Sequence, residues 1–413
     1  MIDLQLLRKD PKLVTERIQA KEPSFNIDRL IELDAQTRQL KLDVESLQKQ
    51  KNDLAKLGKQ GITEEIKEQS IELGKQLKVS QKELESVEQE LKTLWLSCPN
   101  IPEAELPIGN KEANKVVRSI GKKPSFDFAI KNHLELNDHL KWFDFDTGAK
   151  ISGAQFLIYK GLSLKIMYAL VRMMIKNNTQ SGFEPILPPY LVNEETLYNA
   201  GNLPKFEGDY YRIADEKLCL IPTSEVALTN LHADSILSTD ELPLRYTSWT
   251  SCFRKEAGGY GAQDRGLIRI HQFEKVELYS LCTADKSSEE LEHMVGCAEK
   301  LLQQLGLHYQ VSMLATQDCS FQSAKTYDIE VWLPGQDRYY EVSSCSNCTD
   351  FQARRAKIRH RATPEQKPEL VHTLNASSLA LPRLIVALME NYQQKYGSIA
   401  LPQVLLDEMN SLW

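Results

Sequence analysis

Residues 30–54 read LIELDAQTRQLKLDVESLQKQKNDL. Apolar residues recur in this stretch every seven positions, as they do in a coiled-coil helix. One seam of the repeat holds Leu33, Leu40, Leu47 and Leu54, and the second holds Leu30, Thr37, Val44 and Lys51. The stretch therefore predicts one long helix with a narrow apolar stripe that a partner helix must cover.

A second heptad series follows a short segment that contains Gly58 and Gly61. Its seams hold Ile66, Leu73, Ser80, Val87 and Leu94, interleaved with Ser70, Leu77, Leu84 and Leu91. Thr63, followed by two glutamates, is a typical N-cap for this second helix. Two heptad helices joined by a glycine-containing turn predict an antiparallel coiled-coil hairpin over about residues 27–97, roughly 45 Å long at 1.5 Å per residue.

The charges of this arm have two interpretations. The distal part of the first helix, from Lys49 on, carries four lysines, Lys49, Lys51, Lys56 and Lys59, against the single acid Asp53. Such lysines suit a tip that contacts phosphate groups. Taken alone, the hairpin is explained more simply as a coiled coil with a solvated surface.

Composition narrows the class of protein. The chain has 413 residues, and its 50 Lys and Arg against 57 Asp and Glu give a formal net charge of −7. A protein that coats nucleic acid non-specifically is normally strongly basic, so we expect no DNA partner, although a local basic patch is compatible with this balance. No apolar run is long enough for a membrane helix, and the first residues lack the features of a secretory signal. Eight cysteines are too few for a disulfide scaffold, so we expect a cytoplasmic protein with reduced thiols and no membrane partner.

A proline-rich linker separates the arm from the rest of the chain. Residues 98–107 read CPNIPEAELP, and these prolines mark a boundary between residues 1–107 and a second domain, 108–413. The second domain mixes short apolar runs with amphipathic stretches. We predict strands at 218–221, 268–273, 275–281, 329–333 and 370–374, and helices at 161–175, 287–305 and 383–394. Because helices do not regularly follow the strands, we expect an α+β fold with an antiparallel sheet flanked by helices.

Residues 253–256, FRKE, precede a glycine-rich stretch that contains Gly258, Gly259, Gly261 and Gly266. The pattern predicts a strand, a long loop and a second strand. A glycine-rich loop beside an arginine suits the close approach of a phosphate or a nucleic acid. A flexible hairpin loop is the alternative that these residues leave open.

Further motifs carry a family resemblance. The chain contains GNLPKF at 201–206, TSE at 223–225, FRKE at 253–256 and SSCSNCTDFQARR at 343–355. Together with the heptad arm and the linker, they resemble the bacterial-type seryl-tRNA synthetases, a class II aminoacyl-tRNA synthetase family, over essentially the whole chain. The resemblance implies an N-terminal tRNA-binding domain with a coiled-coil arm, a class II catalytic core and a homodimer.

The segment GFEPILPP at 182–189 resembles the first motif of class II synthetases, which lies at the dimer interface. Its residues alone indicate a turn and an edge strand, because Pro188 and Pro189 lack the N–H groups that a central strand requires.

The resemblance also implies the activity. Such an enzyme uses ATP to activate L-serine as seryl-adenylate and transfers the serine to tRNA(Ser), and to tRNA(Sec) where a cell has one. The arm would hold the long variable arm of the tRNA, which makes the lysine-rich tip a candidate contact. Two alternatives are an enzyme that activates an amino acid for a carrier protein and a non-catalytic tRNA-binding paralogue.

By resemblance, ATP and Mg²⁺ have a defined set of contacts. Arg254 would hold the α-phosphate and Arg383 the γ-phosphate, and these two arginines are the candidate catalytic residues. Glu256 would read the adenine amino group, Phe273 would stack on adenine, and Ile270 would provide a backbone contact. The other expected ATP contacts are Lys255, Glu341, Val342, Ser343 and Ser344. Of these, Glu341 and Ser344 would also hold Mg²⁺ through oxygen atoms.

Serine contacts are implied for Thr223, Ser224, Glu225, Glu277 and Ser377. Glu225 would pair with the α-ammonium group, and Glu277 would accept a hydrogen bond from the hydroxyl group. A pocket built around a hydroxyl leaves its acceptor unpaired when alanine enters, which can give roughly 10⁴-fold rejection or more. Threonine must instead be excluded by lack of space.

One segment departs from the family pattern. The third motif usually resembles NGSGLAVGR, whereas residues 375–383 read NASSLALPR. Ala376 and Ser378 add β-carbons where the backbone approaches ligand, and Pro382 suits the first turn of a helix. Since Ser377 and Arg383 remain in register, we expect activity to persist.

Three other features have plain interpretations. The spacing of Cys345 and Cys348 resembles half of a zinc site. No second Cys pair or spaced His pair accompanies them, so we expect no zinc. The basic residues within 354–361 suit either contact with the tRNA acceptor end or one face of a charged strand. His271 is assigned a structural role, because proton transfer does not limit adenylation.

Overall fold

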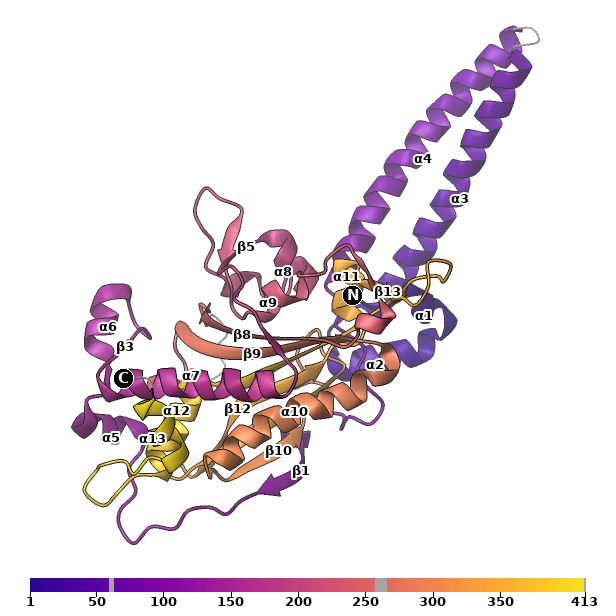
Figure 1. Ribbon diagram of the computed structural model, residues 1–413. Coiled ribbons are helices and arrows are strands. Elements are labelled where there is room, and N and C mark those ends of the chain that lie inside the picture. The colour runs from indigo at the N-terminus through magenta and orange to yellow at the C-terminus, as the bar shows by residue number, and fades with distance from the viewer. Residues whose placement is uncertain (59–62, 257–265, 412–413) are drawn as a thin grey trace. The chain divides into compact units, whose positions relative to one another are not determined.

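The computed structural model describes residues 1–58, 63–256 and 266–411 (Figure 1). Contacts between residues divide the chain into two compact units, Met1–Ile101 and Pro102–Trp413. Among the described residues, none of the helices combines the length and the apolar character that crossing a bilayer requires.

The first unit consists of helices α1 (Leu4–Lys9), α2 (Pro11–Lys21), α3 (Ile27–Gly58) and α4 (Glu64–Leu96). The two long helices form the predicted antiparallel arm (Figure 1). Its seam is visible in the burial pattern, since Leu33 and Thr37 are buried and Leu40 and Leu47 are half-buried between exposed neighbours. The predicted N-cap is confirmed, because the Thr63 hydroxyl accepts from the N–H of Ile66 at 3.3 Å.

The second unit is built on an eight-stranded sheet. Its strands, in spatial order, are β1 (Lys115–Ile120), β10 (Tyr309–Met313), β11 (Lys325–Leu333), β12 (Arg338–Asn347), β15 (His372–Ala380), β9 (Gln272–Cys282), β8 (Leu244–Phe253) and β4 (Glu184–Pro185). All neighbouring pairs are antiparallel except β4 and β8. The predicted α+β class is confirmed, and the segment that contains Pro188 and Pro189 follows the edge strand β4.

Helices cover both faces of this sheet (Figure 1). One face packs against α7 (Leu162–Gln180), α10 (Ser287–Gln304) and α12 (Leu381–Asn391), and the main hydrophobic core lies there. The other face carries α8 (Glu194–Ala200), α9 (Glu225–Thr229) and α11 (Phe351–Ala356). Along β9, Val276 and Leu278 point into the main core. The alternate residues of β9 therefore point to the face that carries α9.

Short elements complete the second unit. They are α5 (His133–Leu140), β2 (Phe143–Asp144), α6 (Phe145–Ser152), β3 (Ile158–Tyr159), β5 (Leu191–Asn193), β6 (Leu218–Leu220), β7 (Ile236–Ser238), β13 (Arg359–Arg361), β14 (Glu369–Leu370), α13 (Gln403–Asn410) and five 3₁₀ turns among the described residues.

Two predicted strands are wrong in part. Residues 266–268 form a 3₁₀ turn, and β9 begins only at Gln272. The ladder stops there because the N–H of His271 donates to the carbonyl of Gln155 at 3.2 Å rather than across the sheet. The predicted strand at 370–374 is interrupted at Val371, because β14 pairs with β13 while β15 pairs with β9. The C-terminal helix predicted at 383–394 runs instead from Leu381 to Asn391.

Candidate functional site

A cavity of about 320 Å³ opens where the ends of β8 and β9 meet the start of α12. This volume lies at the lower end of the range for small-molecule sites. Its wall brings together seven residues that the sequence predicts for ATP or serine: Arg254, Glu256, Ile270, Phe273, Glu341, Ser377 and Arg383. The wall also contains Asp209, Leu267, Ile268, Arg269, Lys275, Ala380 and Pro382, which the sequence argument does not identify.

Arg254 and Phe273 form one end of the cavity. The guanidinium carbon of Arg254 lies 5.2 Å from the centroid of the Phe273 ring, and its Nε donates to the carbonyl of Pro222 at 3.2 Å. The arginine is therefore held in place at the cavity wall. A flat ring and a planar cation at this end suit a nucleotide.

Glu256 pairs with an arginine that the sequence argument missed. Its carboxylate lies 2.6 Å from Arg269, and both side chains are mostly buried. Glu256 adopts a left-handed backbone conformation with φ of 52°, which turns the chain immediately after β8. Ile270, which lies between Arg269 and Phe273 in the sequence, is buried and contributes to the cavity wall.

Arg383 projects from the first turn of α12 toward β12. It donates to the carbonyl of Glu341 at 3.0 Å and lies 3.2 Å from the carboxylate of the same residue. Burial lowers the pKa of Arg383, but the charge and hydrogen bond of Glu341 outweigh that effect, so the pKa is raised. Pro382 occupies the first turn of the helix, as predicted.

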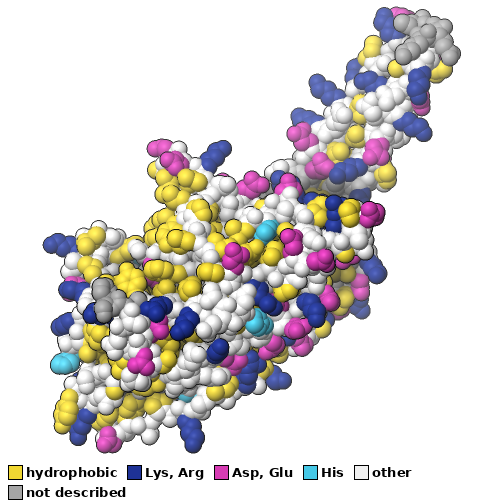
Figure 2. Space-filling view, in the orientation of Figure 1, with side chains coloured by type: hydrophobic (Ala, Val, Ile, Leu, Met, Phe, Trp, Pro, Cys, Tyr) yellow, Lys and Arg dark blue, Asp and Glu magenta, His cyan; other side chains and the backbone are white. Residues whose placement is uncertain are grey.

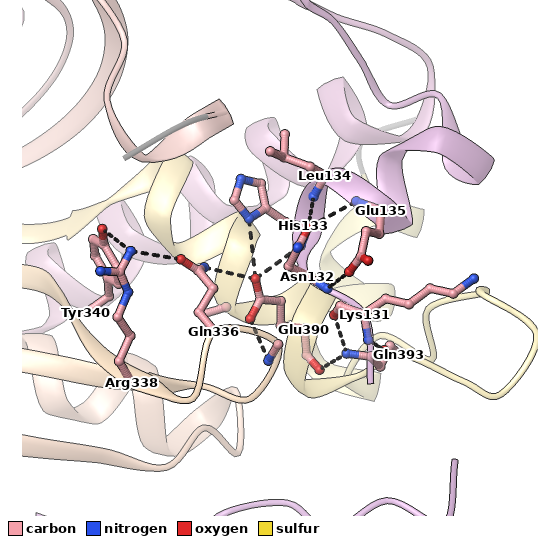
Figure 3. Close-up of polar contacts among 12 residues, drawn as sticks. Lys131, Asn132, His133, Leu134, Glu135, Gln336, Arg338, Tyr340, Glu390 and Gln393 are labelled. Atoms are coloured by element: carbon pink, nitrogen blue, oxygen red, sulfur yellow. Dashed lines mark hydrogen bonds and ion pairs between the residues drawn. The ribbon is translucent and has the colours of Figure 1, made fainter. Parts of the chain in front are cut away.

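A buried carboxylate anchors the other end of α12 (Figure 3). Glu390 is fully buried and accepts from the N–H of His133 at 3.1 Å, from the His133 ring at 3.3 Å, from Gln336 at 3.0 Å and from the N–H of Gly335 at 2.9 Å. These contacts tie α12 to the start of α5 and to the turn between β11 and β12. The helix that carries Arg383 is thus fixed at both ends.

Glu341 and Ser344 lie beside a half-buried acid, Asp328. Burial raises the pKa of Asp328 well above its usual value, and the charge of Glu341 adds to this effect, while a hydrogen bond from Ser344 opposes it. The Oδ1 atom of Asp328 is buried without a hydrogen-bond partner among the described residues. Such a group of oxygen atoms suits a hard cation.

The predicted serine residues lie on the α9 side of the sheet. Thr223 donates to Oε2 of Glu277 at 2.7 Å, and Lys275 donates to the Thr223 hydroxyl at 2.7 Å. Lys275 also forms an ion pair with Glu277. Lys275 was not predicted from the sequence, although its position between Phe273 and Glu277 on one strand face was a signal for it.

Glu225 sits in a polar network beneath this group. Its Oε1 accepts from Gln352 at 2.7 Å and from Asn375 at 3.1 Å. Burial raises the pKa of Glu225 to about 7, and the negative charge of Glu277 contributes further. Gln352 is held in turn by Thr373, which donates to its Oε1 at 2.7 Å. A half-ionised buried carboxylate at neutral pH is suited to receive a cationic group.

Four predicted residues contact the site less directly. The Lys255 side chain is exposed and lies 5.9 Å from the ring of Tyr211, outside the cavity wall. Val342 packs in the main core, and the Ser343 hydroxyl donates to the carbonyl of Ser377. The Ser224 hydroxyl is buried at the start of α9 without a hydrogen-bond partner among the described residues.

Two altered positions of the third motif, 376 and 378, place their side chains away from the cavity, whereas Pro382 lines it. Ala376 belongs to the main core, and the Ser378 hydroxyl donates to Asn178 on α7 at 3.2 Å. Ser377, between them, points the other way and lines the cavity. The β-carbons of Ala376 and Ser378 therefore do not enter the cavity, because strand alternation turns both side chains toward α7.

The remaining sequence candidates have structural partners. Cys345 and Cys348 are both buried thiols. Arg355 is buried against Phe351 and donates to two backbone carbonyls. The basic segment 354–361 is not one strand face, because α11 ends at Ala356 and β13 begins only at Arg359. One nitrogen of the His271 ring contacts the carbonyl of Arg254 at 2.9 Å.

The arm presents a surface of mixed charge (Figure 2). Lys49 and Lys56 are exposed and Lys51 is half-buried on α3. Lys56 pairs with Asp53 at 2.9 Å, and both side chains are largely exposed. Lys59, and with it part of the predicted turn, lies outside the described residues, as do the predicted loop glycines Gly258, Gly259 and Gly261.

Comparisons with known proteins cover both units. Residues 1–102 match the seryl-tRNA synthetase N-terminal domain, and residues 206–392 match the class II tRNA synthetase core domain of the G, H, P, S and T enzymes. The chain is 44% identical to the serine--tRNA ligase of Dehalococcoides mccartyi over 411 residues, which is 98% of each chain. It is 44% identical to the serine--tRNA ligase of Geobacter sulfurreducens over 419 residues, covering 100% of this chain and 99% of that one.

A solved structure is similar along the same length. The seryl-tRNA synthetase of Pyrococcus horikoshii complexed with ATP superposes with a TM-score of 0.94 at 33% identity, covering 99% of this chain and 98% of that chain. The Giardia lamblia prolyl-tRNA synthetase shares the fold at 16% identity with a TM-score of 0.59, covering 68% of this chain and 57% of that one.

Proposed function

This chain belongs to the seryl-tRNA synthetase family, and from that premise we propose how its residues carry out the reaction. The enzyme activates serine with ATP and charges tRNA with it. The observation that supports our assignment is a cavity lined by Arg254, Arg383 and Phe273, whose wall residue Lys275 forms an ion pair with the buried Glu277.

In this proposal the substrate itself supplies the nucleophile. The serine carboxylate attacks the α-phosphorus of ATP and pyrophosphate leaves, so the protein needs to align the groups and neutralise charge. Arg254 binds the α-phosphate and Arg383 binds the γ-phosphate. Phe273 stacks on adenine, Glu256 accepts from its amino group, and the backbone at Ile270 contacts the nucleotide.

The oxygen atoms of Glu341 and Ser344 would hold Mg²⁺. The buried, unpartnered Oδ1 of Asp328 beside them fits a cation at this place. When bound, Mg²⁺ neutralises charge on the ATP phosphates. Contacts within the protein position these groups. Arg383 donates to the carbonyl of Glu341 and forms an ion pair with its carboxylate, which aligns β12 with α12.

At the serine end, Glu225 pairs with the α-ammonium group, and Glu277 accepts from the hydroxyl. Thr223 and Ser224 form the loop before α9, and Ser377 closes the cavity from β15. Lys255, Val342 and Ser343 are the further proposed ATP contacts, and their side chains lie outside the cavity wall.

We assign residues 1–107 to tRNA binding, with tRNA(Ser) held along the arm by Lys49, Lys51, Lys56 and Lys59. We further propose a cytoplasmic homodimer that pairs near β4, and tRNA(Sec) as a second acceptor where a cell has one. Activation of an amino acid for a carrier protein and non-catalytic tRNA binding remain the alternatives.

The first test is amino-acid-dependent exchange between ATP and pyrophosphate without tRNA. We expect exchange with serine and far less with threonine, alanine or glycine. Exchange with alanine or glycine instead would favour the carrier-protein alternative. Folded protein that exchanges with none of the four would favour non-catalytic tRNA binding.

A further inference from the structure

Lys275 lies in the cavity wall between the two ends of the site. It stands on β9 two residues after Phe273 and two before Glu277, and such neighbours on one strand face are about 7 Å apart. Its ammonium group therefore lies between the proposed adenine ring contact and the proposed hydroxyl acceptor. Its side chain is only 8% exposed, so its charge requires partners within the protein.

The contacts of Lys275 determine the direction of the Thr223 hydroxyl. A threonine hydroxyl has one proton and two lone pairs. The ammonium of Lys275 donates to this oxygen at 2.7 Å, and the N–H of Glu225 donates to it at 3.2 Å. Neither group can accept, so the hydroxyl proton must point to Oε2 of Glu277, which lies 2.7 Å away.

This arrangement uses only one oxygen of Glu277. Oε2 receives the Thr223 proton and the ion pair with Lys275. No hydrogen bond to Oε1 occurs among the residues that the structure describes. A carboxylate paired in this way only accepts hydrogen bonds, so Oε1 is left for a donor from the substrate.

Building on the serine site proposed above, we propose that Lys275 is a positioning residue that determines specificity for the serine hydroxyl. It holds Thr223 and Glu277 so that only Oε1 of Glu277 is left to accept a hydrogen bond from the substrate. Alanine has no hydroxyl and gains nothing from this oxygen. Loss of Lys275 therefore penalises serine more than alanine.

The test is Lys275→Met, which keeps the length of the side chain and removes its charge. ATP–pyrophosphate exchange gives kcat/KM for serine and for alanine. We expect the serine-to-alanine ratio to fall by about 10- to 100-fold, the range of one hydrogen bond to a charged group. The KM for ATP should change less than about twofold, because the ATP contacts of Arg254 and Arg383 are untouched.

A matched control is Lys325→Met. Lys325 is another mostly buried lysine of the same sheet, ion-paired with Glu105 and 13% exposed, but outside the cavity wall. The Lys325→Met substitution should lower thermal stability and leave the serine-to-alanine ratio of kcat/KM unchanged. If Lys275→Met lowers both activities by one factor, as a general loss of structure would, the proposal is wrong.

A double-mutant cycle separates positioning from direct contact with substrate. If Lys275 acts through Glu277, then adding Lys275→Met to Glu277→Gln lowers the ratio no further. Additive losses would overturn the positioning role. If Lys275→Met does not fold, Thr223→Val tests the same geometry and should also lower the ratio. Absence of serine-dependent exchange in the unaltered protein would instead refute the proposed function itself.

Discussion

Glu225 is the residue whose ionisation should be visible in the activity. Burial and the charge of Glu277 raise its pKa to about 7, so in the free enzyme the carboxyl is mostly protonated below that pH. Only the ionised form pairs with the serine ammonium group. We therefore predict that the KM for serine falls as pH rises from 6 to 8, by up to about tenfold per unit below the pKa, measured by exchange at saturating ATP.

The control for this titration is Glu225→Gln. This variant should have a high KM for serine that no longer depends on pH in this range, while the hydrogen bond partner Gln352 remains nearby. A KM that keeps the same pH dependence in the variant would assign the titration to another group.

At this scale the sequence motifs predicted seven of the residues that line the cavity, but not the partners that hold them. Arg254, Phe273 and Arg383 were identified and do line the cavity. The partners Lys275 and Arg269 were missed, since motif resemblance marks contacts with ligand and not the residues that hold those contacts. The direction of Ser378 also required the strand, because only the pleat shows that its side chain faces α7.

Helix α12 depends on the single buried carboxylate of Glu390. In Glu390→Gln, an amide NH₂ would face groups that can only donate, including the N–H groups of His133 and Gly335. We predict a loss of about 2–3 kcal/mol in the free energy of unfolding, measured by denaturant titration. The KM for ATP should rise severalfold, because the same helix presents Arg383.

A suitable comparison is Glu290→Gln on α10. Glu290 is also buried and pairs with Arg245 at 2.7 Å, but it is not part of the cavity wall. The Glu290→Gln variant should be less stable than the unaltered protein, with no change in the KM for ATP. An unchanged KM in Glu390→Gln would restrict Glu390 to a role in stability.

The boundaries of helices and strands could be predicted from the sequence where a single hydrophobic periodicity runs through the segment. The seven-residue repeat predicted α3 and α4 closely, because a two-helix arm has few contacts that could override the pattern. The segment at 268–271 misled the sequence argument, since its alternating isoleucines resemble a strand. There a tertiary hydrogen bond from His271 to Gln155 decides the backbone path instead.

At the scale of the whole molecule, the two units divide the chemistry between them. The residues proposed for ATP and serine all lie in the unit that begins at Pro102, and Lys49, Lys51 and Lys56, proposed for tRNA, lie on α3 in the unit that ends at Ile101. Activation without tRNA should therefore be insensitive to the surface of the arm, while aminoacylation depends on it.

Replacing Lys49, Lys51 and Lys56 with Glu tests this division. We predict that the KM for tRNA rises roughly tenfold or more at low salt, because phosphate contacts are lost, and that exchange without tRNA is unchanged. Replacing the exposed Lys122, Lys150 and Lys395 of the second unit with Glu makes the same change in net charge elsewhere and should affect aminoacylation little. Equal effects of the two triple variants would attribute the result to net charge, and equal damage to exchange and aminoacylation would make the arm a structural element rather than a tRNA contact.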